Sequence, residues 1–129
     1  FNPVCFAENV SKNVSEELIK LFEPLGKVPV VDENLIETYA VISAMGHTYF
    51  WFQLQQIKDL AISFGLSEKA SEETISAMLW GTTETLFNSG LSFEEVANLV
   101  PVKPMGEHEG VIKEFYQTSL NAIYQKIKP

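Results

Sequence analysis

The residues best suited to chemistry form one short cluster near the C-terminus, Glu107-His108-Glu109. A histidine between carboxylates can act as a general acid or base, and together with His47 it offers part of a metal site. The alternative is a solvated loop whose acidic side chains favour the start of the next helix. Two histidines without the short ligand spacings of zinc motifs are a weak metal signal. We therefore favour the solvated loop and expect no metal.

Three further side chains have reactive groups, and each has a plain structural alternative. His47 opens a long predicted helix, where it either faces a substrate or lies on a protein interface. Lys103 can attract an anion, although a single lysine in a loop is usually only solvated. Cys5 has no evident base beside it, which favours a small buried hydrophobe over a nucleophile. A single cysteine cannot form an internal disulfide, so we expect a reducing, cytoplasmic setting.

The elements that must position these residues are helical from Asp32 onward. Capping residues and apolar spacing predict helices over about 33–45, 47–64, 68–89 and 93–100. Ser67 is the expected cap of the third helix, and Ser92 with Glu95 forms a capping box for the fourth. A loop with Pro104 and Gly106 then precedes a final helix, so the fold class is mainly α.

The first 31 residues follow a different pattern, strand, helix and strand. Short apolar runs predict strands at Val4–Ala7 and Val28–Val31, and Pro29 favours a sheet edge for the second. Asn13 is the expected cap of the helix between them, with Glu16 completing a capping box. One crossover unit is too small to stand alone, so we interpret 1–31 as the truncated end of a larger α/β domain. The start at Phe1 in place of Met likewise indicates a cut N-terminus.

Charge and composition exclude several partners. The net charge is -8, and all nine basic residues are lysines. Arginine is the usual bidentate ligand of phosphate and of guanine, so an acidic chain without it is a poor match for nucleic acid or an anionic membrane. No apolar run reaches transmembrane length. At 129 residues and 46% hydrophobic, the chain has the size and composition of a folded domain.

The start of the second long helix is apolar on every side, from Tyr49 to Phe52. Such a helix must be buried all round. A second copy of the chain is the simplest source of cover in so short a helical region, which predicts a homodimer. A central helix in a compact monomeric bundle is the alternative, and the pattern alone does not separate the two.

The order of these signals resembles a known family. Gly26-Lys27-Val28-Pro29-Val30-Val31-Asp32-Glu33 precedes a helix, Gly46 and Tyr49 follow it, and Gly65-Leu66 and Gly81 come before the Pro/Gly loop. This arrangement is similar to that of pyrroline-5-carboxylate reductases. The resemblance implies a Rossmann domain that binds NAD(P)H and an α-helical C-terminal domain that forms an intertwined dimer. It assigns 1–31 to the last Rossmann crossover and 32–129 to the dimerisation domain.

The departures from the family fall on its substrate-binding residues. The family's GSGPAY turn corresponds to 44–49, where Gly46 and Tyr49 are kept and His47 replaces proline; the threonine expected upstream is Ala40. Its SPGGTT loop, which holds the substrate carboxylate, corresponds to 103–108, where Pro104 and Gly106 are kept and both threonines are replaced. A glutamate there repels a carboxylate. The resemblance implies these substrate-binding residues: Gly46, His47, Lys103, Pro104, Gly106, Glu107 and His108.

The sequence contains no G-x-G-x-x-G, the fingerprint that cradles a dinucleotide. We therefore expect no NAD(P)H binding by these 129 residues, and NADP or NAD in a full-length protein by resemblance. The function implied is a dimer interface and one pocket wall of a pyrroline-5-carboxylate reductase-like oxidoreductase acting on a small molecule. A reductase for another substrate, or an inactive dimerisation module, are the alternatives, and no catalytic residue is assigned.

Overall fold

The computed structural model describes residues 1–129, and 72% of them lie in helices, which confirms the mainly α fold class. The chain divides into two compact units. The first combines Phe1–Thr48 with Lys113–Pro129, and the second is Tyr49–Ile112. The chain passes from one unit to the other inside two helices, α3 (Gly46–Ser63) and α6 (Glu109–Ile127). Each unit is described by itself below.

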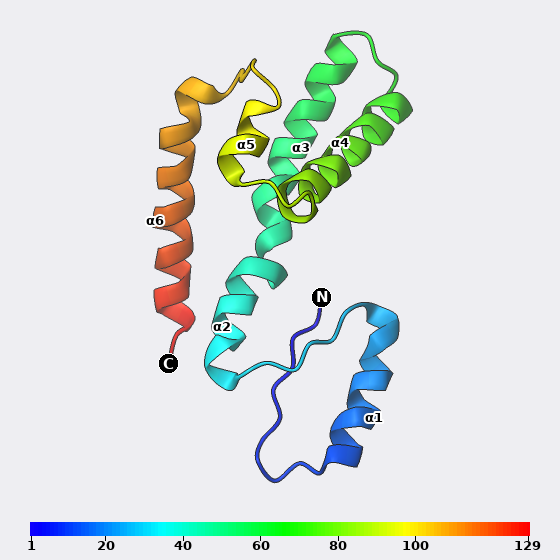
Figure 1. Cartoon of the computed structure of the whole chain (residues 1–129), viewed down its shortest axis with the longest axis vertical. Coiled ribbons are helices and arrows are strands. Elements are labelled where there is room, and N and C mark those ends of the chain that lie inside the picture. The colour runs from blue at the N-terminus through cyan, green and yellow to red at the C-terminus, as the bar shows by residue number, and fades with distance from the viewer. The chain divides into compact units, whose positions relative to one another are not determined.

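The N-terminal part of the first unit contains α1 (Lys12–Phe22) between two extended segments that meet near the N-terminus (Figure 1). They form a single parallel bridge, between Val4 and Val30. Its backbone hydrogen bonds run from Val4 N to Pro29 O at 3.0 Å and from Val31 N to Val4 O at 2.9 Å. The two predicted strands are therefore absent as strands, although the predicted order of extended segment, helix and extended segment is present.

Pro29 explains why the pairing stops at one bridge. Asn2 N donates to Lys27 O at 2.8 Å, which is one half of the next bridge in a parallel ladder. The other half needs a donor at position 29 directed to Asn2 O, and proline has no N–H. The missing donor therefore faces the neighbouring segment, and the sheet-edge role expected for Pro29 stays a prediction.

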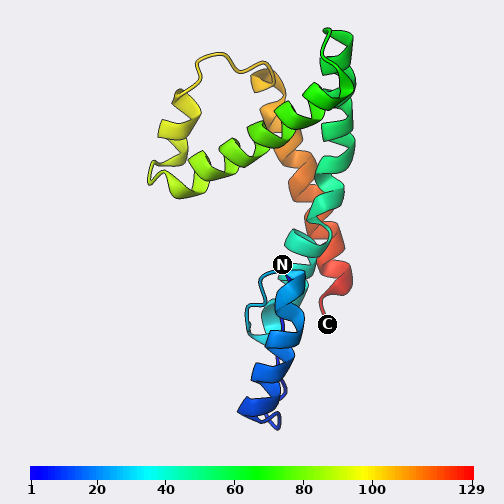
Figure 2. The same ribbon diagram turned by 90° about the vertical axis from the view of Figure 1, so that its right-hand side faces the viewer.

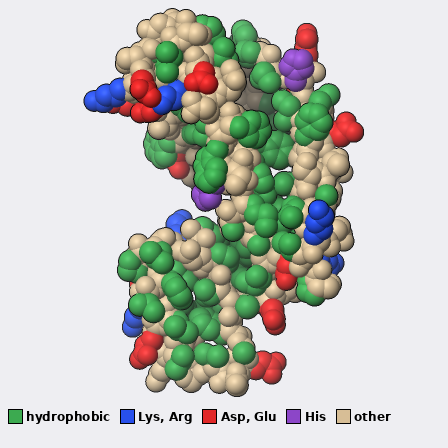
Figure 3. Space-filling model, turned by 180° about the vertical axis from the view of Figure 1, so that it is seen from behind, with side chains coloured by type: hydrophobic (Ala, Val, Ile, Leu, Met, Phe, Trp, Pro, Cys, Tyr) green, Lys and Arg blue, Asp and Glu red, His purple; other side chains and the backbone are tan.

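Helix α1 is held at its ends by local signals but leaves its apolar face uncovered. Its cap is Ser11, which accepts from Val14 N at 3.5 Å, so the predicted cap at Asn13 is wrong. A 3₁₀ turn, Glu23–Leu25, follows, and Gly26 ends it at φ 122°, a conformation that favours glycine. Figure 3 shows hydrophobic side chains gathered over this segment, at the lower left. The exposed apolar residues of the segment are Val14, Leu18, Leu21, Phe22 and Leu25.

The rest of the first unit is a broken helix with the C-terminal part of α6 beside it. A 3₁₀ turn, Glu33–Leu35, leads into α2 (Ile36–Tyr39), and the helix then widens into a π-helical segment, Ala40–Ala44. Met45 N donates five residues back to Ala40 O at 3.0 Å, which is the π-helical bond. Periodicity predicted one regular helix here, so the π-helical turn is a feature that the sequence pattern missed.

The second unit is a helical hairpin with a short third helix. The C-terminal part of α3 and α4 (Glu68–Asn88) are joined by a tight turn and diverge from it, as Figures 1 and 2 show. Gly65 supplies the turn with φ 107°, and Ser67 caps α4 by accepting from Ala70 N at 3.2 Å. Helix α5 (Phe93–Asn98) begins with the predicted capping box of Ser92 and Glu95. These local predictions are confirmed.

Two ion pairs of one lysine link α3 to α4 near the turn of the hairpin. Lys58 Nζ on α3 lies 2.8 Å from Glu68 Oε1 and 2.6 Å from Glu72 Oε1 on α4. Ser71 is fully buried, and its hydroxyl donates to Ser67 O at 2.9 Å. The hydroxyl of Ser71 thus has a partner, as a buried polar group requires.

The buried core of the chain is very small. The buried hydrophobic residues are Val41 and Ile75, one in each unit, while the accessible surface is 10351 Å². Two separate compact domains, each of half this mass, would expose about 8,300 Å² together. The chain therefore exposes an excess of surface, much of it apolar. None of its helices combines the length and apolar character needed to cross a membrane.

Candidate functional site

The first part of the predicted site lies where the π-helical segment meets α3. Gly46 is buried and is the first residue of α3, and His47 beside it is exposed. Thr48 anchors this start, because its backbone N and its Oγ1 both donate to Met45 O, at 2.9 Å and 2.7 Å. Gly46 has no positive φ, and a Cβ built on it meets no atom within 4 Å. The turn is therefore a tight helix start in which backbone N–H groups are used internally.

The second part of the predicted site is the loop Lys103–His108, and all of its residues are exposed. It ends in a 3₁₀ turn, Gly106–His108, that leads directly into α6. Gly106 N donates to Lys103 O at 2.9 Å, and His108 N donates to Met105 O at 3.0 Å. Two local turn hydrogen bonds thus shape the end of the loop, and Pro104 contributes no donor.

The structure assigns these residues to different units. Gly46 and His47 belong to the first unit, and the loop Lys103–His108 belongs to the second. Within the loop the side chains of Lys103, Glu107 and His108 are exposed. No group of three or more histidine, cysteine or acidic side chains is placed to hold a metal ion. The role of these residues in substrate binding stays a prediction.

Cys5 and Tyr49, two side chains outside the loop, differ in how far they are exposed to solvent. Cys5 is exposed, so the prediction of a small buried hydrophobe is wrong for the chain as described. Tyr49, one of the positions kept from the family turn, is half-buried at the start of the second unit. Burial raises the pKa of the Tyr49 hydroxyl above its ordinary value of 10.0, so the group stays a neutral hydrogen-bond donor over the physiological range.

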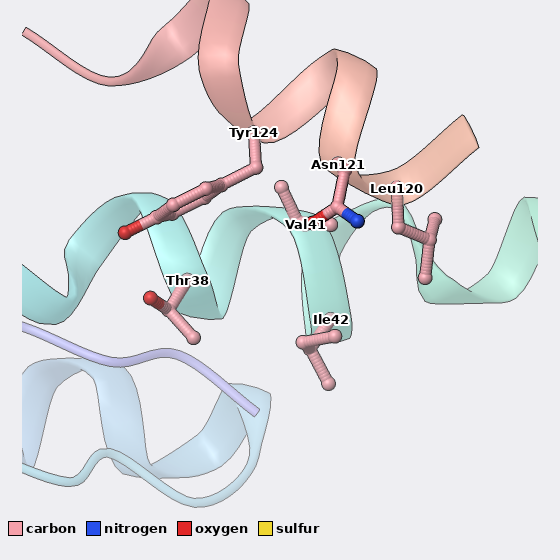
Figure 4. Close-up of a pocket in the computed structure, with 6 residues that line it drawn as sticks. All are labelled: Thr38, Val41, Ile42, Leu120, Asn121 and Tyr124. Atoms are coloured by element: carbon pink, nitrogen blue, oxygen red, sulfur yellow. The ribbon is translucent and has the colours of Figure 1, made fainter. Parts of the chain in front are cut away.

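Sequence reasoning missed a cavity in the first unit, between α2 with its π-helical extension and α6 (Figure 4). Its volume is about 290 Å³, and most of its wall is apolar. Val41, 3% exposed, lies between the two helices, and the Tyr124 ring extends from α6 along α2. The lining residues are Thr38, Val41, Ile42, Leu120, Asn121 and Tyr124. Only the apolar spacing of the two helices signals such a cavity in the sequence, and that spacing equally signals a filled core.

Curated proteins that the chain resembles share one description. Over 122 residues the chain is 24% identical to a pyrroline-5-carboxylate reductase of Staphylococcus haemolyticus, which covers 95% of this chain and 45% of that protein. Over 85 residues it is 29% identical to pyrroline-5-carboxylate reductase 1 of Bacillus subtilis, covering 63% of this chain and 29% of that protein. No family model matches the chain. The chain thus spans less than half the length of these relatives.

Solved structures show where the fold is found. A pyrroline carboxylate reductase of Plasmodium falciparum, solved with NADP bound, matches with a TM-score of 0.79 and 19% identity, over 98% of this chain and 54% of that chain. A pyrroline-5-carboxylate reductase of Coxiella burnetii matches with a TM-score of 0.57 and 22% identity, over 96% and 46% of the two chains. These matches confirm the resemblance that the sequence predicts: the chain is similar to pyrroline-5-carboxylate reductases over about half of their length and shares the fold of that part.

Proposed function

We propose that the chain is the C-terminal part of a pyrroline-5-carboxylate reductase-like, NAD(P)H-dependent oxidoreductase, in which it supplies a dimer interface and one wall of the substrate pocket. The observation that carries the proposal is the match of nearly the whole chain to about half of such reductases, one of them solved with NADP bound. The cofactor would supply the hydride, and the residues of this chain would position the substrate. Such a protein is expected in the cytoplasm.

The first 31 residues support the presence of a preceding α/β domain. The parallel bridge between Val4 and Val30, with α1 connecting its two segments, has the connectivity of a crossover unit. Leu21 on α1 and Leu25 in the 3₁₀ turn after it are 68% and 70% exposed, as expected for an apolar face that lacks the sheet it should cover. We therefore keep 1–31 as the end of a nucleotide-binding domain and 32–129 as the helical domain.

The exposed apolar surface supports a homodimer. Trp51 and Phe52 near the start of α3 are 66% and 70% exposed, and the chain as a whole exposes about 2,000 Å² more than two separate compact domains of half its mass. An obligate interface buries more than roughly 2,000 Å² in total and is rich in apolar area. The exposed aromatic residues of the second unit are Phe50, Trp51, Phe52, Phe64, Trp80, Phe87 and Phe93.

The alternative function is an inactive dimerisation module. Such a module would have the same dimer interface as the proposed reductase but would not bind a nucleotide. The chain contains no G-x-G-x-x-G, so a dinucleotide site must come from residues outside it. The coding sequence upstream of Phe1 is the first observation to make. A strand followed by this fingerprint supports the reductase.

The decisive measurement is calorimetric titration of the whole protein with NADPH and NADH, followed by an assay of NAD(P)H oxidation with cyclic imines. We expect saturable binding of one nucleotide and turnover of an imine. The matched control is a variant of the whole protein in which the first glycine of the fingerprint is replaced by a bulky residue, which should abolish binding and leave the dimer intact. A whole protein that forms the dimer and binds neither nucleotide would establish the inactive module instead.

A further inference from the structure

We infer that the negative charge of the second unit regulates the self-association of the chain, so that two copies bind weakly at low ionic strength and more tightly as salt screens their charge. This inference rests on the proposed function, because it takes the exposed apolar surface of the second unit as the interface with a second copy. It adds to that interface an electrostatic repulsion that opposes the apolar attraction.

The charge of the chain is concentrated in the second unit. This unit contains nine acidic residues and three lysines, which leaves a net charge of -6 with histidine neutral. The first unit contains eight acidic residues and six lysines, which leaves -2. Lys58 and Lys69 already form ion pairs with glutamates of their own chain. Lys103 is therefore the one lysine of the second unit left to pair with a carboxylate of another copy, and it cannot offset the charge.

The same unit offers most of the apolar surface. Seven of the ten exposed phenylalanine and tryptophan side chains lie in it. The chain exposes about 2,000 Å² more than two separate compact domains of half its mass, which is enough area for an obligate interface with a second copy. Association through this unit therefore brings two strongly negative surfaces together.

Glu84 shows how closely the two features are combined. It follows Trp80 by four positions and precedes Phe87 by three, so the three side chains share one face of α4. Trp80 and Phe87 are 68% and 74% exposed, and Glu84 is exposed between them. Asn88 Nδ2 donates to Glu84 Oε1 at 3.0 Å along the same helix. A second copy that covers the two rings must also approach this carboxylate, which is unfavourable for an acidic surface.

Salt should relieve this repulsion over an accessible range. At about 0.01 M ionic strength the Debye length is about 30 Å, so carboxylates repel one another across the whole of a domain-sized interface. At about 0.15 M the Debye length is about 8 Å, and only carboxylates close to the contact still interact. Association should therefore tighten with salt, whereas an interface held by ion pairs between copies would loosen.

The test is sedimentation equilibrium of the 129-residue chain in NaCl at these two ionic strengths, with circular dichroism to verify the helical fold. We expect the dissociation constant of the dimer to fall by about tenfold or more from the lower to the higher concentration. Glu84→Gln keeps an oxygen that can accept from Asn88 and removes the charge. It should lower the dissociation constant by about two- to fivefold at low salt, as for an exposed charge, and by less at high salt.

Glu17→Gln is the matched control, because Glu17 is equally exposed but lies on α1 in the first unit. An equal effect of this variant would attribute the repulsion to overall charge and overturn the assignment to the second unit. An identical salt response of wild type and Glu84→Gln would attribute it to the solvent and likewise overturn the inference. A wild-type dimer that loosens with salt, or ignores it, would overturn the inference and leave the proposed interface standing. A folded monomer at both ionic strengths would overturn both.

Discussion

At the scale of single residues, Lys58 is the clearest case in which charge shapes the fold. Its ammonium group lies within 2.8 Å of carboxylates of both Glu68 and Glu72, which hold the hairpin of the second unit near its turn. The hydrogen bonds to Glu68 and Glu72 raise the pKa of Lys58 above its ordinary 10.5, and the bond to Lys58 lowers the pKa of Glu68 below 4.5. These interactions should make the stability of the hairpin depend on pH in both the acid and the alkaline range.

The substitution Lys58→Met should lower the melting temperature slightly at neutral pH, because the glutamates are solvent-exposed and such pairs contribute little. A depressed carboxyl pKa stabilises the fold above pH 4.5, and the effect is lost as the pH falls through the lowered value. A raised lysine pKa stabilises below pH 10.5, and the effect is lost as the pH rises through the raised value. The difference between wild type and variant should therefore be largest between these limits.

Thermal unfolding followed by circular dichroism across the pH range measures this difference. Lys69→Met is the control, because Lys69 only reaches Glu73 at 3.8 Å within one helix turn and both side chains are exposed. It should change the melting temperature less than Lys58→Met. A Lys58→Met difference that stays constant from acid to neutral pH would show that the ion pairs of Lys58 do not stabilise the hairpin.

At the scale of elements, Pro29 decides the extent of the N-terminal pairing. The substitution Pro29→Val restores an N–H opposite Asn2 O, so a second bridge between Asn2 and Val28 becomes possible. We expect a gain of about 0.5–1.5 kcal/mol in the local free energy of opening, the net value of one hydrogen bond. Hydrogen exchange should show a protected amide at position 29.

Pro3→Val is the control for this prediction. Pro3 lies between the paired residues Asn2 and Val4, so a new N–H at position 3 would point away from the neighbouring segment and should exchange rapidly. Rapid exchange at both positions would contradict the ladder register assigned here.

At the scale of the whole molecule, the exposed apolar surface predicts a dimer. Sedimentation at micromolar concentration should give twice the chain mass of 14.5 kDa. Phe52→Glu, which places a charge on the apolar start of α3, should weaken the dimer by at least tenfold, since a buried aromatic anchor contributes about 2 kcal/mol or more.

Leu21→Glu is the control, because Leu21 is 68% exposed and Phe52 is 70% exposed, but Leu21 lies on α1. We expect this variant to leave dimerisation unchanged. A folded monomer at this concentration, or equal effects of the two variants, would contradict the proposed interface.

Much of the helical structure could be predicted from the sequence, because its signals act over a few residues. Ser67, Gly65 and the pair Ser92 and Glu95 mark helix ends through groups no more than four positions apart, and all were identified correctly. The start of α1 was misplaced by two residues, because Ser11 and Asn13 are both good caps and only the folded geometry selects one. The single-residue widening of the helix at Ala40–Ala44 has no marker in the apolar periodicity.

The mainly α class, the approximate helix boundaries in the second unit and the resemblance to pyrroline-5-carboxylate reductases all follow from the sequence alone. The tertiary structure was needed to see that the two N-terminal extended segments share a single parallel bridge, between Val4 and Val30. The physical reason is range. Helices and their caps depend on residues that are neighbours along the chain. Pairing of extended segments depends on which distant residue lies opposite each backbone donor. Pro29 shows this directly, because the effect of its missing N–H depends on Asn2, which lies 27 positions away along the chain.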